Sequence, residues 1–341
     1  MRAVESPESS VLAELQQRLL GDVIGTGRAE FAAAANLDVD LVASFLHALG
    51  FLVAQSDSAQ YFEADLAAIT AVTGLIEQGR LDQDLALAMT RAVARTTDRL
   101  TVWQTDLVAE SLLTHGAAQA DGGLDATTAL RVAEQLTESA AAFEPLLIFA
   151  WRRHLLASLT RLVSDASPED GASGPTRVVG FADLVNFSAM VRRATQKELA
   201  AMVMRFEQLA SDIVTAHGGR VIKTVGDEVL FANTDPLAGS ATALDLVAAM
   251  AEEKVLPQVR VGLAYGPVLS RLGDVFGTTV NRAARLTGLA QAGGVLADEA
   301  LAARLTEVSG FQVTPTRRRH LRGVGMVTPA VITRLVGERR G

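Results

Sequence analysis

The feature that most constrains this chain is a hairpin pattern in its second half, RVIKTVGDEVLF at residues 220–231. An apolar run lies on each side of Gly226-Asp227, and such a pair predicts a tight turn because the turn needs a residue that tolerates positive φ. The hairpin would present the Asp227 carboxylate in its turn and the Lys223 amine on the incoming strand. Taken alone, this pattern is best explained as an ordinary surface hairpin.

Two other stretches place polar side chains in related positions. Upstream, RVVGFADLVNFS at residues 177–188 predicts an apolar strand that ends at Asp183. A carboxylate at a strand end suits a metal ion, because the sheet fixes the carboxylate while the next loop stays open. Downstream, GDVFGTTVNRAAR at residues 273–285 predicts a helix on which Asn281 and Arg285 share one face at i and i+4.

Together these stretches resemble the catalytic domain of the class III nucleotidyl cyclases. The resemblance rests on an F-x-D-x-x-x-F-[ST] loop, a K-[ST]-x-G-D hairpin and a D-x-x-G-x-x-V-N-x-A-[SA]-R segment, in that order. The matching residues are Phe181, Asp183, Phe187, Ser188, Lys223, Thr224, Gly226, Asp227, Asp274, Gly277, Val280, Asn281, Ala283 and Arg285. The resemblance covers about residues 174–336, roughly half of the 341-residue chain.

The resemblance implies an adenylate cyclase, which converts ATP to 3′,5′-cyclic AMP and pyrophosphate. It implies two metal ions per site, Mg²⁺ or Mn²⁺, with Asp183 and Asp227 as their ligands. One ion would activate the ribose 3′-oxygen, and the other would hold the β- and γ-phosphates. Asn281 would orient the ribose, and Arg285 would stabilise charge that develops on the α-phosphate.

The resemblance assigns base choice to Lys223 and Asp274. Adenine offers N1 as an acceptor and its 6-amino group as a donor, so a lysine donor beside an aspartate acceptor suits it. Guanine reverses these positions, and guanylate cyclases of the family typically carry Glu and Cys there. The chain is therefore expected to use ATP, because a hydrogen-bonding site rejects a base that leaves its polar groups unpaired.

Two further regions are expected to contact the substrate. The loop at residues 184–188, which includes Phe187 and Ser188, leads into a helix and could contact phosphates through backbone amides. The family's L-K-G lysine, which contacts the triphosphate, corresponds to Arg322 in HLRG at residues 320–323. We expect Arg322 to take that role, since arginine binds phosphate bidentately, although the neighbouring arginines at 317–319 could supply the contact instead.

The first half of the chain has a different composition. Residues 1–165 contain 11 Arg, no Lys and 22 Asp or Glu, a net charge of −11, against +3 for the remainder. Apolar spacing near 3.6 predicts helices throughout, at residues 11–24, 31–35, 39–49, 61–78, 82–115, 126–142 and 146–163. Residues 30–51 have the pattern of a helix-turn-helix, but its exposed positions offer no Lys or Arg to meet phosphates. We therefore expect a packing module and no nucleic-acid partner.

The second half predicts alternating elements. These are a strand at 176–183, a helix at 195–217 capped by Thr195 and Glu198, a hairpin at 220–232, a helix at 236–254, a strand pair at 258–272 that turns at 265–267, a helix at 278–291, a strand at 294–297, a helix at 298–307, and strands near 311–318 and 328–335. This order is that of a ferredoxin-like α+β core, the fold that the motifs also imply.

The sequence thus predicts an all-helical regulatory and dimerisation domain at 1–163, a linker at 164–176 and the cyclase catalytic domain at 177–341. The acidic half resembles the N-terminal domains of some soluble actinobacterial adenylate cyclases, which dimerise and in some cases respond to pH. His47, His115 and His154 would be the candidate sensors. The absence of a secretory signal, of cysteine and of a membrane-spanning segment predicts a cytoplasmic protein without a membrane partner.

The resemblance also implies a homodimer. In this family the metal aspartates of one site and its base-reading and catalytic residues come from opposite subunits, and this chain carries both sets. Two alternatives remain open. One is a catalytically silent cyclase-like sensor, whose mark would be missing motif residues, and the other is a guanylate cyclase, which Lys223 and Asp274 disfavour.

Overall fold

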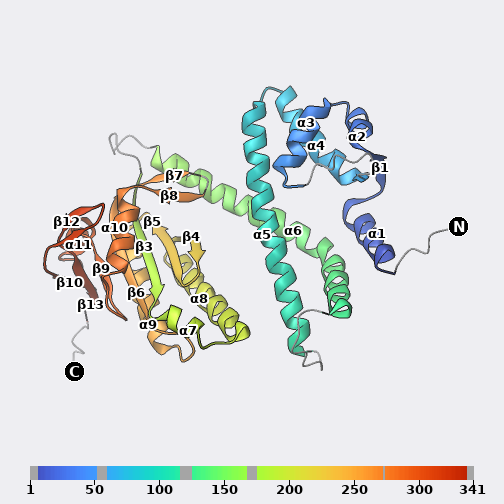
Figure 1. Ribbon diagram of the computed structural model, residues 1–341. Coiled ribbons are helices and arrows are strands. Elements are labelled where there is room, and N and C mark those ends of the chain that lie inside the picture. Colours follow the sequence, from blue (N-terminus) through green and yellow to red (C-terminus); the bar gives the residue numbers. More distant parts are fainter. Residues whose placement is uncertain (1–6, 52–59, 116–124, 167–174, 272, 336–341) are drawn as a thin grey trace. The chain divides into compact units, whose positions relative to one another are not determined.

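The computed structural model describes residues 7–51, 60–115, 125–166, 175–271 and 273–335 (Figure 1). The chain divides into two compact units, residues 1–160 and 161–341. Helix α6 (Ala126–Asp165) crosses this boundary, so the first two residues of the expected linker at 164–176 are helical. Strand β3 (Thr176–Leu184) already includes the last linker residue. Residues 167–174 lie outside the described residues.

The first unit is helical apart from one short strand pair. Its helices are α1 (Pro7–Leu20), α2 (Arg28–Ala35), α3 (Val39–Ala48), α4 (Glu63–Glu77), α5 (Gln83–His115) and most of α6. Strands β1 (Val23–Thr26) and β2 (Gln60–Phe62) pair antiparallel, so the helix predictions for residues 23–24 and 61–62 were wrong. The break predicted at 143–145 was also wrong, because α6 continues through Pro145. The apolar spacing on both sides outweighs the single lost main-chain donor.

The predicted helix-turn-helix is the centre of this unit's core. Phe31 of α2 and Phe45 of α3 are fully buried, and the Phe31 ring stacks on Tyr61 with centroids 4.5 Å apart. Asp38 caps α3 by accepting the main-chain N–H groups of Asp40 and Leu41, at 2.9 and 3.2 Å. The apolar faces of α2 and α3 are thus used for packing, which is what the acidic composition favoured.

Among the described residues, no single helix has the length and apolar character needed to cross a membrane. Helices α2 and α3 meet those criteria only as a pair, and they are bent by 102° relative to each other. Of the candidate pH sensors, His47 and His154 are exposed on α3 and α6, while the side chain of His115 lies outside the described residues.

The second unit is built on a seven-stranded sheet in the order β10-β13-β9-β6-β3-β5-β4. Every neighbouring pair is antiparallel except β6 and β9. The sheet strands after β3 are β4 (Arg220–Val225), β5 (Glu228–Asn233), β6 (Val259–Pro267), β9 (Val295–Ala297), β10 (Phe311–Pro315) and β13 (Ala330–Arg334). Two separate hairpins join β7 (Leu269–Arg271) to β8 (Asp274–Phe276), and β11 (Arg319–Leu321) to β12 (Gly325–Val327). The helices are α7 (Phe187–Val191), α8 (Gln196–Ala216), α9 (Pro236–Glu252), α10 (Thr278–Thr287) and α11 (Glu299–Leu305).

The chain order β3-α8-β4-β5-α9-β6 produces the spatial order β6-β3-β5-β4, which is the ferredoxin-like arrangement predicted from the sequence. Helix α8 begins after Thr195, whose side chain and that of Glu198 form the predicted capping box. Three local predictions were incomplete or wrong. The turn predicted at 265–267 was wrong, because β6 continues through it and pairs with β3 as far as Pro267. Helix α7 and the β11–β12 hairpin were not predicted.

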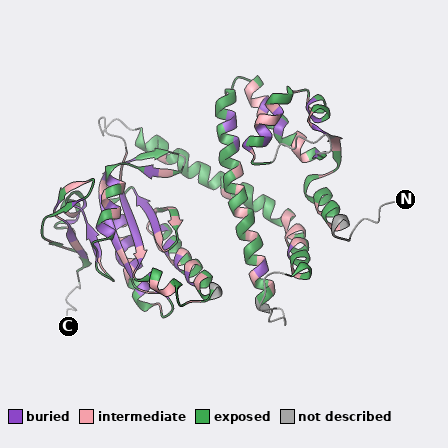
Figure 2. Ribbon diagram, in the orientation of Figure 1, coloured by how far each residue is buried: buried purple, intermediate pink, exposed green. Residues whose placement is uncertain are grey.

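The two faces of this sheet carry different helices. Val178, Ala182 and Leu184 of β3 belong to the core cluster that includes residues of α8 and α9, whereas Val179 and Phe181 pack in the cluster that includes Ala283 of α10. Figure 2 shows the central strands buried between these layers. Because side chains alternate along a strand, Asp183 at the end of β3 lies on the α10 face.

Helix α10 lies directly on the sheet because β6 has a glycine beneath it. A Cβ on Gly262 would lie 2.2 Å from the Thr287 main-chain nitrogen and 2.5 Å from the Ala283 carbonyl oxygen. The Thr287 hydroxyl also donates to the Phe181 carbonyl, at 3.2 Å. This close approach fixes the height of α10 above β3 and β6, and with it the position of the side chains on the helix's outer face.

We expect Gly262→Ala to lower the free energy of unfolding by about 1–3 kcal/mol, because backbone atoms of α10 must move to admit the methyl group. Chemical denaturation measures the change. Gly288→Ala is a matched control at the end of α10, where the nearest atom to the new methyl would be 3.7 Å away. That variant should stay within about 0.5 kcal/mol of the wild type. Equal stability of the two variants would show that the contact of α10 with β6 tolerates a side chain.

Candidate active site

The two predicted metal-binding aspartates lie at neighbouring strand ends. Asp183 is the penultimate residue of β3, and Asp227 lies in the two-residue turn between β4 and β5. The Leu184 main-chain N–H donates to the Asp227 carbonyl oxygen at 3.1 Å, which ties the turn to the end of β3. Gly226 in the same turn has φ of 61°, the left-handed conformation that the Gly-Asp pattern predicted. The turn follows from local sequence, and the pairing of β3 with β5 brings the two carboxylates close together.

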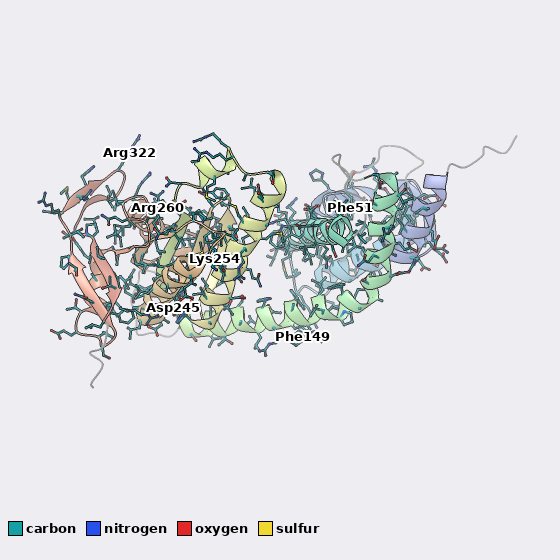
Figure 3. All side chains as sticks on the ribbon, turned by 90° about the horizontal axis from the view of Figure 1, so that it is seen from below. Phe51, Phe149, Asp245, Lys254, Arg260 and Arg322 are labelled. Carbon is teal, nitrogen blue, oxygen red and sulfur yellow. The ribbon has the colours of Figure 1, made fainter. Side chains whose placement is uncertain are left out.

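Two charged residues beside them were not singled out from the sequence. In the strand register Asp183 is opposite Glu228 of β5 on one side and Arg260 of β6 on the other. The Arg260 guanidinium binds the Asp183 carboxylate with Nε and Nη2 at 2.6 and 2.5 Å (Figure 3 labels Arg260). The position of Glu228 directly after Asp227 was a usable signal, but the role of Arg260 depends on a pairing between distant strands.

The carboxylates repel one another. Burial raises the pKa of Asp227, and the nearby Asp183 charge raises it further, while the turn's own backbone and Arg260 oppose the shift. Burial also raises the pKa of Glu228, with Asp183 and Asp227 adding to the effect and Arg260 and Lys223 opposing it. Among the described residues no group of three or more His, Cys, Asp or Glu side chains has the arrangement of a complete metal site. Two hard oxygen ligands with unfavourable mutual charge nevertheless fit a divalent cation that takes its other ligands from a substrate.

We expect Glu228→Gln to raise the thermal unfolding midpoint at pH 8 in the presence of a chelator. The raised pKa means that the folded state binds the Glu228 proton more tightly than the unfolded chain does, so deprotonation destabilises the fold. This penalty is absent below about pH 4.3, the unfolded-state pKa of glutamate, and is complete above the raised pKa. Calorimetry from pH 4 to 8 should therefore show a stabilisation by the amide that grows with pH.

Glu252→Gln is the matched control for this experiment, because Glu252 is exposed at the end of α9. It should leave the unfolding midpoint almost unchanged across the same range. A stabilisation by Glu228→Gln that does not depend on pH, or that Glu252→Gln reproduces, would contradict the electrostatic explanation.

The predicted base-reading residues are already in contact. Lys223 of β4 donates from Nζ to Oδ2 of Asp274 at the start of β8, at 2.5 Å. Burial opposes the ionised form of Asp274, but hydrogen bonds from Lys223 and from the Val275 main-chain N–H, with the charges of Lys223 and Arg220, together lower the pKa of Asp274. The structure therefore brings together a fixed donor and a fixed, ionised acceptor from two motifs that are 51 residues apart.

The predicted catalytic pair lies on α10. Asn281 and Arg285 are one turn apart and both are exposed. Within the described part of the chain, no hydrogen bond or ion pair involves either side chain. Gly277 is the N-cap residue of this helix, and its φ of 129° is accessible mainly to glycine. The glycine of the third motif is therefore needed for its backbone conformation. Both polar groups are thus presented on the exposed face of a helix, unpaired within the part of the chain that the structure describes.

The loop after Asp183 differs partly from its prediction. Phe187 is buried in the core that includes residues of α8 and α9, while Ser188 is exposed at the start of α7. The amides of Leu184 and Val185 already donate to the carbonyl oxygens of Asp227 and Gln258. Among the described residues, the amides of Asn186, Phe187 and Ser188 have no main-chain acceptor outside regular elements and are left to meet a phosphate. The Phe187 ring anchors this loop from inside the core.

Arg322 lies in the turn of the β11–β12 hairpin and is exposed (Figure 3). Its neighbours Arg317 and Arg318 precede β11 and Arg319 begins it, and all three are also exposed. Arg318 lies close enough to Glu299 to lower the pKa of that carboxyl, together with the stronger hydrogen bonds that Thr328 donates. Arg318 thus has an acidic neighbour, whereas no ion pair or side-chain hydrogen bond involves Arg322 among the described residues.

The site residues divide into two groups by their predicted roles. The first group is the metal carboxylates with Glu228 and Arg260 beside them, and the second contains the base-reading pair, the α10 pair and the hairpin arginine. Among the described residues no hydrogen bond or ion pair joins the two groups, whose members are Asp183, Asp227, Glu228 and Arg260 on one side and Lys223, Asp274, Asn281, Arg285 and Arg322 on the other. The charge of Lys223 nevertheless acts on Glu228.

Comparison with known proteins decides the family. A model described as the adenylate and guanylate cyclase catalytic domain matches residues 175–333. An adenylate cyclase of Glutamicibacter nicotianae is 34% identical over 98% of this chain and 85% of the relative. The chain belongs to the class III adenylate cyclases. A second adenylate cyclase, from Streptomyces coelicolor, is 35% identical over 97% of this chain and 93% of the relative, and one from Streptomyces griseus is 36% identical over 89% and 74%.

These matches confirm the resemblance drawn from the three motifs. The alignments with the first two relatives extend over both units, so this class III adenylate cyclase shares its helical N-terminal half with them. Class III cyclase domains are generally metal-dependent, which agrees with the paired carboxylates at the ends of β3 and β4.

Proposed function

We propose that this enzyme converts ATP to 3′,5′-cyclic AMP and pyrophosphate, at two active sites shared between the subunits of a homodimer. The observation that carries the choice of ATP is the 2.5 Å contact between Lys223 and Asp274. Both side chains are partly exposed, so a base can reach them. Lys223 would donate to adenine N1, and the Asp274 carboxylate would accept from the 6-amino group. Guanine would leave both groups unpaired.

Asp183 and Asp227 would hold the metal ions, two per site, as the family resemblance implies. When bound, the ions supply positive charge to the triphosphate and lower the pKa of the ribose 3′-hydroxyl. Arg260 offsets the charge of Asp183 in their absence, and its two hydrogen bonds keep that carboxylate at the strand end. The raised pKa of Asp227 supports this assignment, because a cation would offset the burial and the Asp183 charge that raise it.

The remaining side chains would position the triphosphate and stabilise charge. The ribose 3′-oxygen attacks the α-phosphorus, the bond from that phosphorus to the bridging oxygen breaks, and pyrophosphate leaves with the electron pair while the hydroxyl proton passes to solvent. Asn281 would orient the ribose, and Arg285 would meet the charge on the α-phosphate. Arg322, and the free amides near Ser188, would contact the other phosphates.

Exposed apolar side chains support a shared site. Val225 beside the Asp227 turn is 63% exposed, and Leu269 and Phe276 of the β7–β8 hairpin are 62% and 48% exposed. Such a patch around polar functional groups is typical of a surface that another protein covers. A second copy of the catalytic unit would cover it and would bring Asn281 and Arg285 to the carboxylates of its partner.

The helical unit supports dimerisation in the same way. On α6, Phe149 and Trp151 are 61% and 60% exposed, and Figure 3 shows Phe149 projecting from the helix. We assign regulation and dimerisation to residues 1–163 and catalysis to 177–341. Helix α6 continues past residue 160, so a change in the helical unit would reach the catalytic unit through this helix.

The direct test is cyclic-nucleotide formation by the full-length protein, with ATP or GTP and with Mg²⁺ or Mn²⁺. Cyclic AMP from ATP, with at least about 10²-fold lower efficiency on GTP, is the expected result. Cyclic GMP as the main product would reverse the base assignment. Absence of both products from a folded dimer would instead favour the catalytically silent sensor.

A further inference from the structure

Strand β4 contains a bulge that brings two cationic side chains to one face of the sheet. Residues three apart on a regular strand point to opposite faces. In β4, however, the register shifts between Val221 and Lys223, so that Arg220 is opposite Ala232 and Lys223 is opposite Leu230. These two partners are two apart on β5 and therefore share a face. Bulges next to active sites commonly re-aim a side chain in this way.

That face carries the β7–β8 hairpin. Leu230 packs in the cluster that contains Val275 of β8 and Ala283 of α10. The Arg220 Nη2 donates to the Gly273 carbonyl oxygen at 3.4 Å, immediately before Asp274. The bulge thus places Arg220 beside the backbone of the same turn whose carboxylate Lys223 binds.

Asp274 also interacts electrostatically with Arg220. Partial burial lowers the pKa of Arg220, the charges of Arg161 and Arg177 lower it further, and Asp274 opposes the shift. Asp165 at the end of α6 accepts a 2.5 Å hydrogen bond from Arg177 and so offsets the charge of that guanidinium. The negative charge of Asp274 favours the charged form of Arg220. The charge of Arg220 in turn helps to keep Asp274 ionised.

We propose that Arg220 is a positioning residue for base recognition, which holds the β7–β8 turn so that the Asp274 carboxylate meets the 6-amino group of adenine. Lys223 must bring an N–H group to adenine N1, so its hold on Asp274 weakens when the base binds. Arg220 contacts the turn without competing for the base. This role rests on the proposed function, in which Asp274 accepts from the 6-amino group.

The test compares ATP with purine riboside 5′-triphosphate, which lacks only the 6-amino group, on the full-length enzyme. The wild type should prefer ATP by about 10-fold or more in kcat/KM, the value of one well-placed hydrogen bond to a charged acceptor. In Arg220→Gln this preference should fall to about 2-fold, through a higher KM for ATP, while kcat/KM for the analogue stays within about 2-fold of wild type. Arg220→Lys should keep part of the preference, because it retains the charge but loses the fixed fork of donors.

Arg271→Gln is the matched control, since Arg271 is the cross-strand neighbour of Asp274 in the β7–β8 hairpin and its substitution removes the same positive charge near that carboxylate. It should keep the wild-type preference. An equal loss on both substrates in Arg220→Gln would show a general structural role, and an equal effect of Arg271→Gln would show a general charge effect. Either result overturns the proposal.

The wild-type result tests base reading by Asp274, and the variant result tests the role of Arg220. If the wild type does not distinguish ATP from the analogue, base reading by Asp274 is wrong and the role of Arg220 falls with it. If the wild type prefers ATP and Arg220→Gln keeps the full preference, only the role of Arg220 is wrong.

Discussion

Mixing Asp227→Ala with Arg285→Ala protein should restore adenylate cyclase activity that neither variant has alone. If the carboxylates of one subunit act with the α10 residues of the other, a mixed dimer contains one site with both defects and one site with none. Random exchange makes half of the dimers mixed, so activity should recover to about a quarter of the wild-type value. Each variant alone should have an activity at least about 10²-fold below that of the wild type, because each lacks a group that stabilises transition-state charge in every site.

Asp183→Ala mixed with Asp227→Ala is the matched negative control. Both substitutions remove a carboxylate from the same half of a site, so every dimer of this mixture has a defect in each site and should remain inactive. Cyclic AMP formation after subunit exchange measures the recovery, and tagged subunits verify that mixed dimers form. Lack of recovery in verified mixed dimers of the first pair would rule out the shared site.

The large expected effect follows from how the subunit presents its charged groups. Asn281 and Arg285 lie on an exposed helix face, and no hydrogen bond joins them to Asp183 or Asp227 in the described structure. Among the described residues Arg260 is the cation that pairs with Asp183, and it does so as a neighbour in the sheet rather than as a group aimed at an α-phosphate. Under the proposed shared site, a lone subunit would therefore hold the parts of two half-sites.

Motifs that depend on local geometry could be predicted from the sequence. The Gly226-Asp227 turn, the Asp183 strand end and the i, i+4 pair on α10 each follow from the conformational demands of a few adjacent residues. The ferredoxin-like order was predictable as well, because the helices and strands alternate with clear periodicity. The capping box at Thr195 is another feature of this local kind.

Features that depend on strand register could not be predicted. Arg260 lies 77 residues from Asp183 and meets it only because β3 and β6 pair along their whole length. The same pairing outweighed the local turn signal at Gly266-Pro267. The bulge that brings Arg220 and Lys223 to one face exists only in the pairing of β4 with β5. The order of residues along the chain does not show which residues of distant strands lie opposite one another.

The second large effect is expected from exchanging the base-reading pair. Lys223→Glu combined with Asp274→Cys should lower kcat/KM for ATP by at least about 10³-fold and make GTP the better substrate. The new carboxylate would accept from guanine N1–H and the thiol would donate to O6, whereas adenine would leave both groups unpaired. Steady-state kinetics with both nucleotides, at saturating Mn²⁺, measure the switch.

The single substitution Lys223→Glu separates base matching from the loss of the ion pair. It removes the 2.5 Å contact and sets a carboxylate beside the ionised Asp274, so that neither adenine nor guanine finds a complementary pair. We expect this variant to use both nucleotides poorly, and the second substitution, Asp274→Cys, to raise activity on GTP while leaving ATP a poor substrate. If Lys223→Glu alone kept the ATP preference, the 2.5 Å pair would be a structural ion pair, and base choice would have to come from another part of the site.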